Sequence, residues 1–387
     1  MPTPKTKPTP HGNKVAAPAA ESPRLLATLA AIDNALRKAR TALLAADDAG
    51  LARALQAGEQ RAVKELPDSH PRRQRALAEF AFERLYAEFV SMRPGFDAAA
   101  QQTASLLPAT GSNDLLARVL ALRAFACGRD DQIERQVAVA RQALGLAPAD
   151  PFVGLYVHLA LAGSLHWIGE FTSTALHFRP ALTCARALGE PLLEAFALRN
   201  IAVAETKESR HAWEAGHATV HMAAQAEASL RGCIHYYLDK TSRRRLTYPW
   251  LCVAETLMLQ GRFDDALLLY DEHLPAAQAD GLLLQAAEGA SRRARCLLSL
   301  QRLPAALGAS DQALQWLAGY DDPDVAVTVH SDRALVLTAL GRDGDAAESL
   351  ALAAAARATL TTLRERYRLP LLQALDGVVP LPISPAR

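Results

Sequence analysis

Hydrophobic side chains recur along this chain at alternating steps of three and four residues. The first run of this kind consists of Leu25, Leu29, Ile32, Leu36, Ala39 and Leu43. This spacing places the apolar side chains on one face of an amphipathic α-helix. The same periodicity continues almost to the C-terminus, and it is interrupted by short stretches that carry Gly, Pro or Asp. The pattern predicts an all-α protein.

Several segments of the chain are similar to one another at a period of about 40 residues. They align on the turn residues Gly128, Gly169, Gly261, Gln301 and Gly341. A weaker copy fits with Lys207 at the turn, which leaves an insertion of roughly 14 residues near 232–249. Self-similarity at a fixed period of this length predicts a solenoid of helical hairpins.

Two columns of this alignment hold alanine. The first column, seven residues before the turn, contains Ala121, Ala162, Ala254, Ala294 and Ala334. The second column, twelve residues after the turn, contains Ala140, Ala181, Ala313 and Ala353. Small side chains at these positions let antiparallel helices approach one another closely. The columns therefore predict stacked hairpins with buried contacts at both sites.

The segment LQGRFDDAL at 259–267, with small residues at fixed offsets on both helices, resembles the tetratricopeptide repeat. The longer period is similar to the sensor arrays of bacterial LuxR-type activators and diguanylate cyclases. The resemblance implies a right-handed α-solenoid of antiparallel helix hairpins. We expect a disordered tail at 1–23, degenerate N-terminal hairpins at 24–110, repeats at 111–369 and a C-terminal tail at 370–387.

The charge and the cysteine content limit which classes of partner and which cellular compartment we expect. The 42 Lys and Arg residues nearly balance the 41 Asp and Glu residues, so no net field attracts nucleic acid or an anionic membrane. The 5 cysteines form no CxxC pair, which is typical of reduced thiols in a cytosolic protein. The first residues lack the continuous apolar run of a secretory signal. We expect a cytoplasmic protein without a membrane partner.

The sequence contains none of the common catalytic motifs that we searched for. Motifs for a phosphate cradle, a dinucleotide turn, a nucleophile elbow and a zinc-protease helix are all missing. We therefore expect no enzyme activity and no cofactor, the alternative being an enzyme hidden in residues 25–107. One face could hold zinc through Glu214, His217 and His221 with Cys233 and His235 nearby. Histidines at helical spacing arise readily by chance, so we predict no metal site.

In the tetratricopeptide family the first helix of each hairpin lines a concave groove, through positions thirteen, ten, six, three and two before the turn. The resemblance therefore places in the groove Tyr156, His166, Trp167, Glu194, Glu205, Tyr248, Glu255, Glu288, Ser291 and Arg295. Arg199 joins this candidate binding surface from a column that it shares with Arg293 and Arg333. A repeated arginine can pair with carboxylates of the stack or with acidic groups of a partner.

The sequence as a whole predicts a scaffold that binds a protein or peptide on its concave face, in bacterial signalling or regulation. The alternative is a sensory or dimerisation module, including a homodimer, that regulates a separate diguanylate cyclase or transcription factor. Neither a GGDEF signature nor a helix-turn-helix is present. Arg243, Arg244 and Arg245 in the expected insertion could meet a nucleic acid, but the neutral total charge favours a solvated loop.

Overall fold

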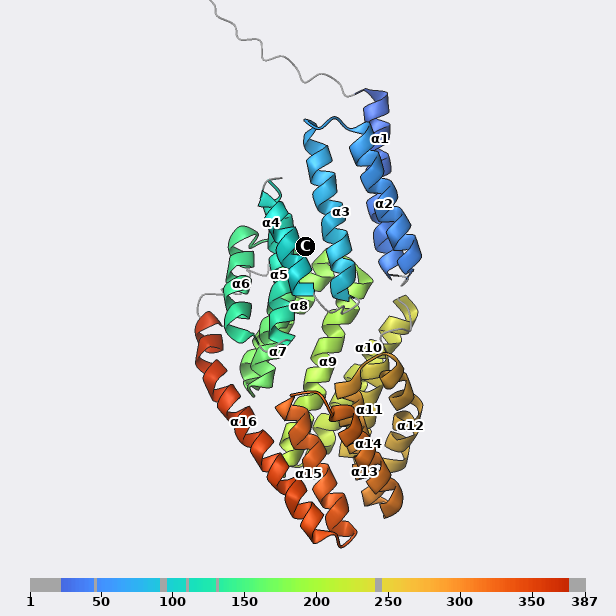
Figure 1. Ribbon diagram of the computed structural model, residues 1–387, viewed down its shortest axis with the longest axis vertical. Coiled ribbons are helices and arrows are strands. Elements are labelled where there is room, and N and C mark those ends of the chain that lie inside the picture. The colour runs from blue at the N-terminus through green and yellow to red at the C-terminus, as the bar shows by residue number, and fades with distance from the viewer. Residues whose placement is uncertain are drawn as a thin grey trace, which may run out of the picture.

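The computed structural model describes residues 22–44, 47–90, 96–108, 111–129, 132–240 and 246–375. Within these ranges it contains sixteen α-helices and no strand, which confirms the all-α prediction (Figure 1). The first eight are α1 (Pro23–Leu44), α2 (Asp48–Glu65), α3 (Pro71–Val90), α4 (Phe96–Leu106), α5 (Asn113–Arg129), α6 (Ile133–Leu146), α7 (Pro151–Trp167) and α8 (Phe171–Leu188). The others are α9 (Pro191–Glu214), α10 (Val220–Lys240), α11 (Thr247–Leu259), α12 (Phe263–Ala279), α13 (Leu283–Ser299), α14 (Leu303–Leu317), α15 (Pro323–Ala339) and α16 (Asp343–Leu375).

The helices form consecutive hairpins that stack through their first members. Each odd-numbered helix from α1 to α13 contacts the next odd-numbered helix along the array. Each even-numbered helix from α2 to α14 packs against its own partner and against the first helix of the following hairpin. Every hairpin therefore buries the apolar face of its neighbour, which is the arrangement expected of a repeat solenoid.

Both alanine columns are buried, as the repeat predicts. In the first column the exposed fraction is 0% for Ala121, Ala162, Ala254 and Ala294, and 2% for Ala334. In the second column it is at most 2% for Ala140, Ala181, Ala313 and Ala353. Larger side chains at such close contacts would force the helices apart, at a cost of about 1–3 kcal/mol for each overpacked site.

Most turns of the repeat require a left-handed backbone. The φ angles of Gly169, Gly261 and Gly341 are 83°, 77° and 71°. Glycine adopts this conformation without the steric conflict that a Cβ atom causes, which explains its recurrence at the ends of the first helices. Gln301 occupies the equivalent position with a φ of 58°, and it is the one non-glycine residue of positive φ among the described residues.

The weak copy of the repeat has a different register from the one expected. Lys207 lies inside α9, and the turn with positive φ is at Gly216. Gly216 stands 47 residues after Gly169 and 45 residues before Gly261, so the extra length is divided between the long helices α9 and α10. Ser209, seven residues before Gly216, is 1% exposed and takes the place of the column alanine.

The expected insertion at 232–249 is largely helical. Its first part belongs to α10, where Tyr237 is fully buried and the hydroxyl of Tyr236 donates a hydrogen bond to Glu194. Its last part begins α11. Arg243, Arg244 and Arg245 lie outside the described residues, as do residues 1–21 of the tail expected at 1–23 and residues 376–387.

The last helix crosses back over the array. α16 has 33 residues, pairs with α15 and reaches α6 and α7 with its C-terminal half (Figure 1). The ring of Tyr367 lies 6.3 Å from that of Trp167 on α7, and Leu371 is fully buried in the same apolar cluster. The helix thus continues beyond residue 369, where we expected a tail. No helix of the described ranges is long and apolar enough to span a membrane.

Candidate functional site

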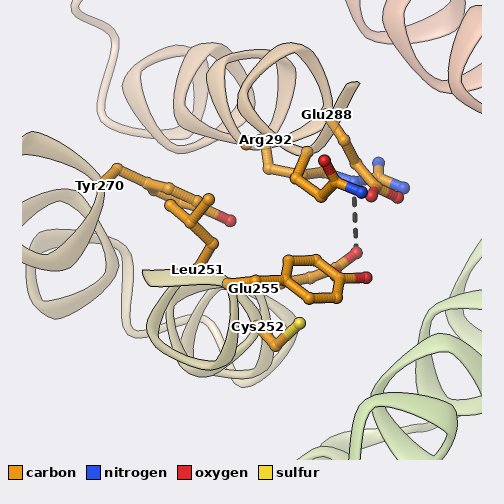
Figure 2. Close-up of a pocket in the computed structure, with 9 residues that line it drawn as sticks. Leu251, Cys252, Glu255, Tyr270, Glu288 and Arg292 are labelled. Carbon is orange, nitrogen blue, oxygen red and sulfur yellow. Dashed lines mark ion pairs between the residues drawn. The ribbon is translucent and has the colours of Figure 1, made fainter. Parts of the chain in front are cut away.

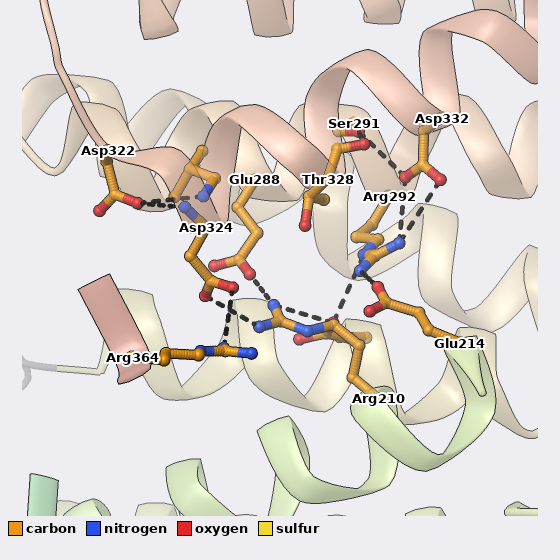
Figure 3. A network of polar contacts seen from close by, with 12 residues as sticks. Arg210, Glu214, Glu288, Ser291, Arg292, Asp322, Asp324, Thr328, Asp332 and Arg364 are labelled. Carbon is orange, nitrogen blue, oxygen red and sulfur yellow. Dashed lines mark hydrogen bonds and ion pairs between the residues drawn. The ribbon is translucent and has the colours of Figure 1, made fainter. Parts of the chain in front are cut away.

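Five helices converge on a sheltered group of charged side chains, which we call the polar network (Figure 3). Its members are Arg210 and Glu214 on α9, Glu255 on α11, Glu288, Ser291, Arg292 and Arg295 on α13, Asp324 and Asp332 on α15, and Arg364 on α16. The side chains of Arg210 and Arg292 are only 1% and 2% exposed. A buried guanidinium is costly unless carboxylates surround it, and the network supplies them.

Arg210 connects four helices. Its Nη1 contacts Glu288 on α13 and lies 3.8 Å from Oε1 of Glu255 on α11. Its Nη2 lies 3.3 Å from Oδ2 of Asp324 on α15. Asp324 also lies 3.8 Å from Nη2 of Arg364, so the network extends to the last helix. A single side chain of α9 thereby contacts the first helices of all three following hairpins.

Arg292 makes a second set of ion pairs deeper in the array. Its Nη2 lies 2.6 Å from Oε1 of Glu214, and its Nη1 lies 3.1 Å from Oδ2 of Asp332. Asp332 also accepts hydrogen bonds from Ser291 Oγ and Arg295 Nη1, both at 3.0 Å. Charge-assisted bonds of this kind are stronger than neutral ones, so these side chains are held in fixed positions.

Burial and neighbouring arginines shift the pKa values of the carboxylates in opposite directions. Burial alone would raise the pKa of Asp324, but Arg210 and Lys207 outweigh it and lower the value to about 2. At Glu214, too, Arg292 and Arg210 outweigh burial and lower the pKa. At Glu255 burial dominates, with a contribution from Glu288, and the pKa is raised. Glu255 is thus the carboxylate of this set whose charge is least well compensated.

A small cavity opens beside the network, between α11, α12 and α13 (Figure 2). Its empty volume is about 220 Å³, counted with the open space at its mouth. The polar side chains that line it are Tyr248, Glu255, Tyr270, Gln285, Glu288 and Arg292. Sites for small organic ligands are usually about 300–1,000 Å³. The space that it encloses is only about 10 Å³, which holds about one water molecule and neither a side chain nor a cofactor.

The structure brings together the candidate site residues of the hairpins that contain Gly261 and Gln301. Tyr248, Glu255 and Glu288 line the cavity, and Ser291 and Arg295 bind Asp332. The guanidinium of Arg295 also lies 4.7 Å from the ring centroid of Trp213. These contacts place four of the sequence-derived candidates in the polar network and Tyr248 at the cavity beside it.

The candidates of the hairpin containing Gly169 are not members of the polar network. Tyr156 is 1% exposed and belongs to the apolar core, where its hydroxyl lies 2.9 Å from that of Tyr86. His166 is 8% exposed, and Trp167 packs on α16. Tyr156 therefore does not line an open wall, because aromatic residues of α3 and α5 cover this part of α7.

The three candidates chosen with Lys207 at the turn also lie elsewhere. Glu194 accepts hydrogen bonds from Arg186 and Tyr236, and Arg199 lies over the ring of Phe196 at 4.9 Å. Glu205 is partly buried, and its Oε2 has no hydrogen-bond partner. These residues were selected in the wrong register, since the helix continues for two more turns before Gly216.

The corrected register recovers residues that the sequence analysis missed. Arg210 and Glu214 stand six and two residues before Gly216, which are offsets already assigned to the groove. The sequence does contain a signal for this register, because Gly216 in the segment EAGH could have been chosen as the turn residue in place of Lys207. Arg292 and Asp332 share the position nine before their turns, which was not among the groove offsets. Only the packed structure shows that this position also faces the network.

Of the three arginines in the shared column, Arg199, Arg293 and Arg333, the last two form ion pairs within the array. Nε of Arg293 lies 2.7 Å from Asp271, and Nη1 of Arg333 lies 2.6 Å from Asp311. In both pairs the arginine belongs to a first helix and the aspartate to the second helix of the preceding hairpin. The column thus forms a repeated cross-brace between hairpins, with partners other than the glutamates near the network.

The candidate zinc face is divided by the end of a helix. α9 ends at Glu214, which binds Arg292, whereas His221 belongs to α10 and Cys233 is buried in the core. Within the described ranges no three His, Cys, Asp or Glu side chains are arranged to hold a metal ion.

No protein-family model matches the chain, and no curated protein matches it in sequence. Among solved structures, the chain is similar to a Rap protein complexed with Competence and Sporulation Factor, with a TM-score of 0.55 and 12% identity over 90% of this chain and 99% of that one. For NprR in complex with its cognate peptide NprX the TM-score is 0.51 and the identity is 13%, over 92% of this chain and 85% of that one. For aspartyl phosphate phosphatase F from Bacillus subtilis the TM-score is 0.51 and the identity is 13%, over 87% of this chain and 95% of that one. These likenesses show a shared tetratricopeptide-like fold.

Proposed function

We propose that this chain is a scaffold of bacterial signalling or regulation that binds a protein or peptide on the inner faces of α9, α11, α13 and α15. The observation that carries the proposal is the polar network, which collects charged side chains from four successive first helices. The Rap and NprR structures of similar fold contain Competence and Sporulation Factor and the cognate peptide NprX, respectively.

The rim of the network supplies the groups that a partner can reach. The side chain of Glu214 is 38% exposed and that of Arg295 is 26% exposed, whereas their partners Arg292 and Asp332 are buried. The inner groups hold the rim charges in place, so a ligand meets side chains that have little rotamer entropy left to lose. Such preorganisation favours specific binding to an extended or helical peptide.

Asp332 of the network is better suited to holding its neighbours in place than to catalysis. Its most buried carboxylate, Asp332, accepts bonds from Ser291, Arg292 and Arg295. A general base needs a carboxylate free to accept a proton from substrate, and a carboxylate with three donors is poorly suited to that role. We therefore infer a non-enzymatic function.

A sensory role for the same site is favoured by Arg364. This residue links Asp324 of the network to α16, whose far end packs on α6 and α7. A ligand that competes for Asp324 would loosen this link and alter the position of α16. Binding could then be transmitted to a separate output protein, as expected of a sensor array.

Site-specific photo-crosslinking tests the binding surface. A benzoylphenylalanine in place of Tyr248, a partly buried residue of α11 that lines the cavity, is expected to capture partner protein or peptide in cells. The control position is Leu268 on α12, which is 70% exposed on a second helix. Equal capture at both positions, or capture at Leu268 alone, would show that binding does not use the inner faces.

A further inference from the structure

We propose that the surface of α6 and α7 covered by the end of α16 binds a basic amphipathic helix of the partner. In this structure the surface is occupied by residues 360–375 of the chain itself, which we call the strap (Figure 1). The strap thereby regulates where a partner can bind, and this role rests on the function proposed above.

The strap is the part of α16 that extends beyond its hairpin partner. α15 has 17 residues and α16 has 33, so an antiparallel pair with α15 uses only about the first half of α16. The second half crosses the array to α6 and α7. Its position therefore depends on the contacts that it makes there, rather than on the hairpin to which it belongs.

One face of the strap is apolar. Leu360, Tyr367 and Leu371 are buried, and their spacing of seven and four residues places them on one side of the helix. Tyr367 and Leu371 belong to the apolar cluster that contains residues of α6 and α7, and Tyr367 packs on Trp167. Trp167 is one of the groove positions that the tetratricopeptide resemblance selects. The strap thus lies where a helix bound in a groove would lie.

The rim of this surface is acidic, and the strap is basic. Nη2 of Arg366 lies 3.4 Å from Oε1 of Glu134 on α6. Nε of Arg368 lies 2.6 Å from Oε1 of Glu170, between α7 and α8. The strap contains three arginines and one glutamate, so its net charge is +2. Complementary charge of this kind orients a bound helix and selects a basic partner over an acidic one.

The strap is held by contacts that another helix can replace. The arginines that pair with Glu134 and Glu170 are 63% and 60% exposed, and ion pairs in contact with water contribute little to stability. Pro370 lies inside the strap, where it removes one hydrogen bond of the helix backbone. The buried Nε of Arg364 has no hydrogen-bond partner among the described residues. A partner helix without these two defects would therefore compete well for the surface.

Release of the strap would also change the polar network. Nη2 of Arg364 lies 3.8 Å from Oδ1 of Asp324, so the strap supplies one of the cations of this carboxylate (Figure 3). Asp324 would keep Arg210, whose Nη2 lies 3.3 Å from its Oδ2. A helix that displaces the strap from α6 and α7 would thus alter the binding surface on α15 at the same time. The strap is in this sense an autoinhibitory contact.

A peptide with the sequence of the strap tests the surface. The probe is fluorescein-labelled RATLTTLRERYRLPLLQAL, residues 357–375, and fluorescence anisotropy measures its Kd for the intact chain. The opened variant carries Arg366→Glu and Arg368→Glu, which sets carboxylates against Glu134 and Glu170 and leaves the surface itself unchanged. We expect it to bind the probe about ten-fold more tightly than the wild type, in which the strap competes intramolecularly.

The matched control carries Arg342→Glu and Arg357→Glu. These changes alter the net charge equally, but both residues are exposed and lie outside the strap, so the Kd should stay at the wild-type value. A second probe has glutamate in place of both arginines at 366 and 368, and it should bind the opened variant about ten-fold more weakly than the first. Hydrogen exchange of the strap should become faster in the opened variant only.

Three results would overturn the inference. The first is equal affinity of the wild type and the opened variant for the probe, including no detectable binding to either. The second is equal binding of the two probes by the opened variant, because charge would then select nothing. The third is unchanged hydrogen exchange of the strap in the opened variant, because the ion pairs would then not hold it.

A milder variant covers the case in which the opened variant fails to fold. Arg368→Glu alone should show the same faster exchange, and the addition of Glu170→Arg should restore slow exchange by reversing the pair. Glu170 makes no side-chain cap to α8, so its substitution leaves that helix start intact. Crosslinking through Tyr248 that persists when the strap results are negative would leave the proposed function intact and reject this inference alone.

Discussion

Nη2 of Arg292 on α13 lies 2.6 Å from Oε1 of Glu214 on α9, although the two residues are 78 positions apart and α11 stacks between their helices. Most contacts in a repeat array join neighbouring hairpins only. This ion pair spans two hairpin interfaces, and the pair of Arg210 with Asp324 spans three. The network therefore ties together hairpins that would otherwise be coupled only through their neighbours.

Removal of the Arg292 guanidinium is expected to destabilise the fold strongly. Arg292→Met keeps a flexible apolar stem but leaves Glu214, Glu255 and Asp332 without their shared cation. Breaking a buried ion pair by removing one partner costs about 3–5 kcal/mol. Urea unfolding measures the change in the free energy of unfolding.

The control for this variant is Arg342→Met. Arg342 pairs with Asp345 across an exposed helix turn, with both side chains about half exposed. Exposed ion pairs contribute about 0–1 kcal/mol, so this change should be small. Similar losses for the two variants would contradict the structural importance of the network.

Buried histidines should make stability depend on pH. Nδ1 of His158 lies 2.9 Å from Nδ1 of His177, and burial lowers the pKa of both residues to about 4. Unfolded histidine has a pKa of about 6.5, so between about pH 6.5 and pH 4 the unfolded state binds more protons than the native state. Stability is therefore present above this range and falls as the pH decreases through it.

The expected slope is on the order of 1 kcal/mol per pH unit for each such histidine. Urea unfolding at a series of pH values measures it. His177→Asn should flatten the dependence because one titrating group is lost, whereas substitution of the exposed His217 should leave it unchanged. A free energy of unfolding that is constant over the range would contradict the prediction.

Replacement of Gln301 by glycine should stabilise the array. Gln301 has a φ of 58°, in the region where a Cβ atom costs about 1–2 kcal/mol. Part of that gain is offset, because glycine loses more backbone entropy on folding, by about 0.5–1 kcal/mol. We expect Gln301→Gly to raise the free energy of unfolding by up to about 1 kcal/mol, seen as a higher Tm. The reverse change, Gly261→Gln, should lower it.

The crossing of α16 over the array depends on its buried apolar residues. Leu371 is fully buried against the cluster that contains α6 and α7, whereas Leu369 is 65% exposed. Leu371→Ala should cost about 2–5 kcal/mol and Leu369→Ala well under 1 kcal/mol. Hydrogen exchange should report loss of protection in the last part of α16 and at its contacts on α7, while α12 to α14 stay protected. Uniform loss along the chain would argue against a locally anchored helix.

The repeat could be read from the sequence because its determinants are local and recur. The alanines at Ala254 and Ala294 are small because two helices approach there, and Gly261 and Gly341 are glycines because the backbone is left-handed. Each copy confirms the others, so the hairpins and their order followed from spacing alone. The same logic failed at Lys207, where longer helices replace the regular period and the true turn at Gly216 was overlooked.

The candidate site could be predicted only in part. Tyr248, Glu255, Glu288 and Arg295 were found because the offsets of a regular hairpin fix which side of the helix they occupy. Arg210 was missed because those offsets were counted from the wrong turn. The return of α16 to α7 had no sequence signal, since Leu371 lies more than two hundred residues from the side chains that bury it.

The sequence by itself determined the all-α class, the helix hairpins and most of their turns, because helical periodicity and glycine conformation act over a few residues. Only the tertiary structure decided which charges meet at the polar network and that α16 closes back over α6 and α7. Ion pairs and buried surfaces depend on distances across the stack, and small changes in helix length alter those distances without changing the local pattern.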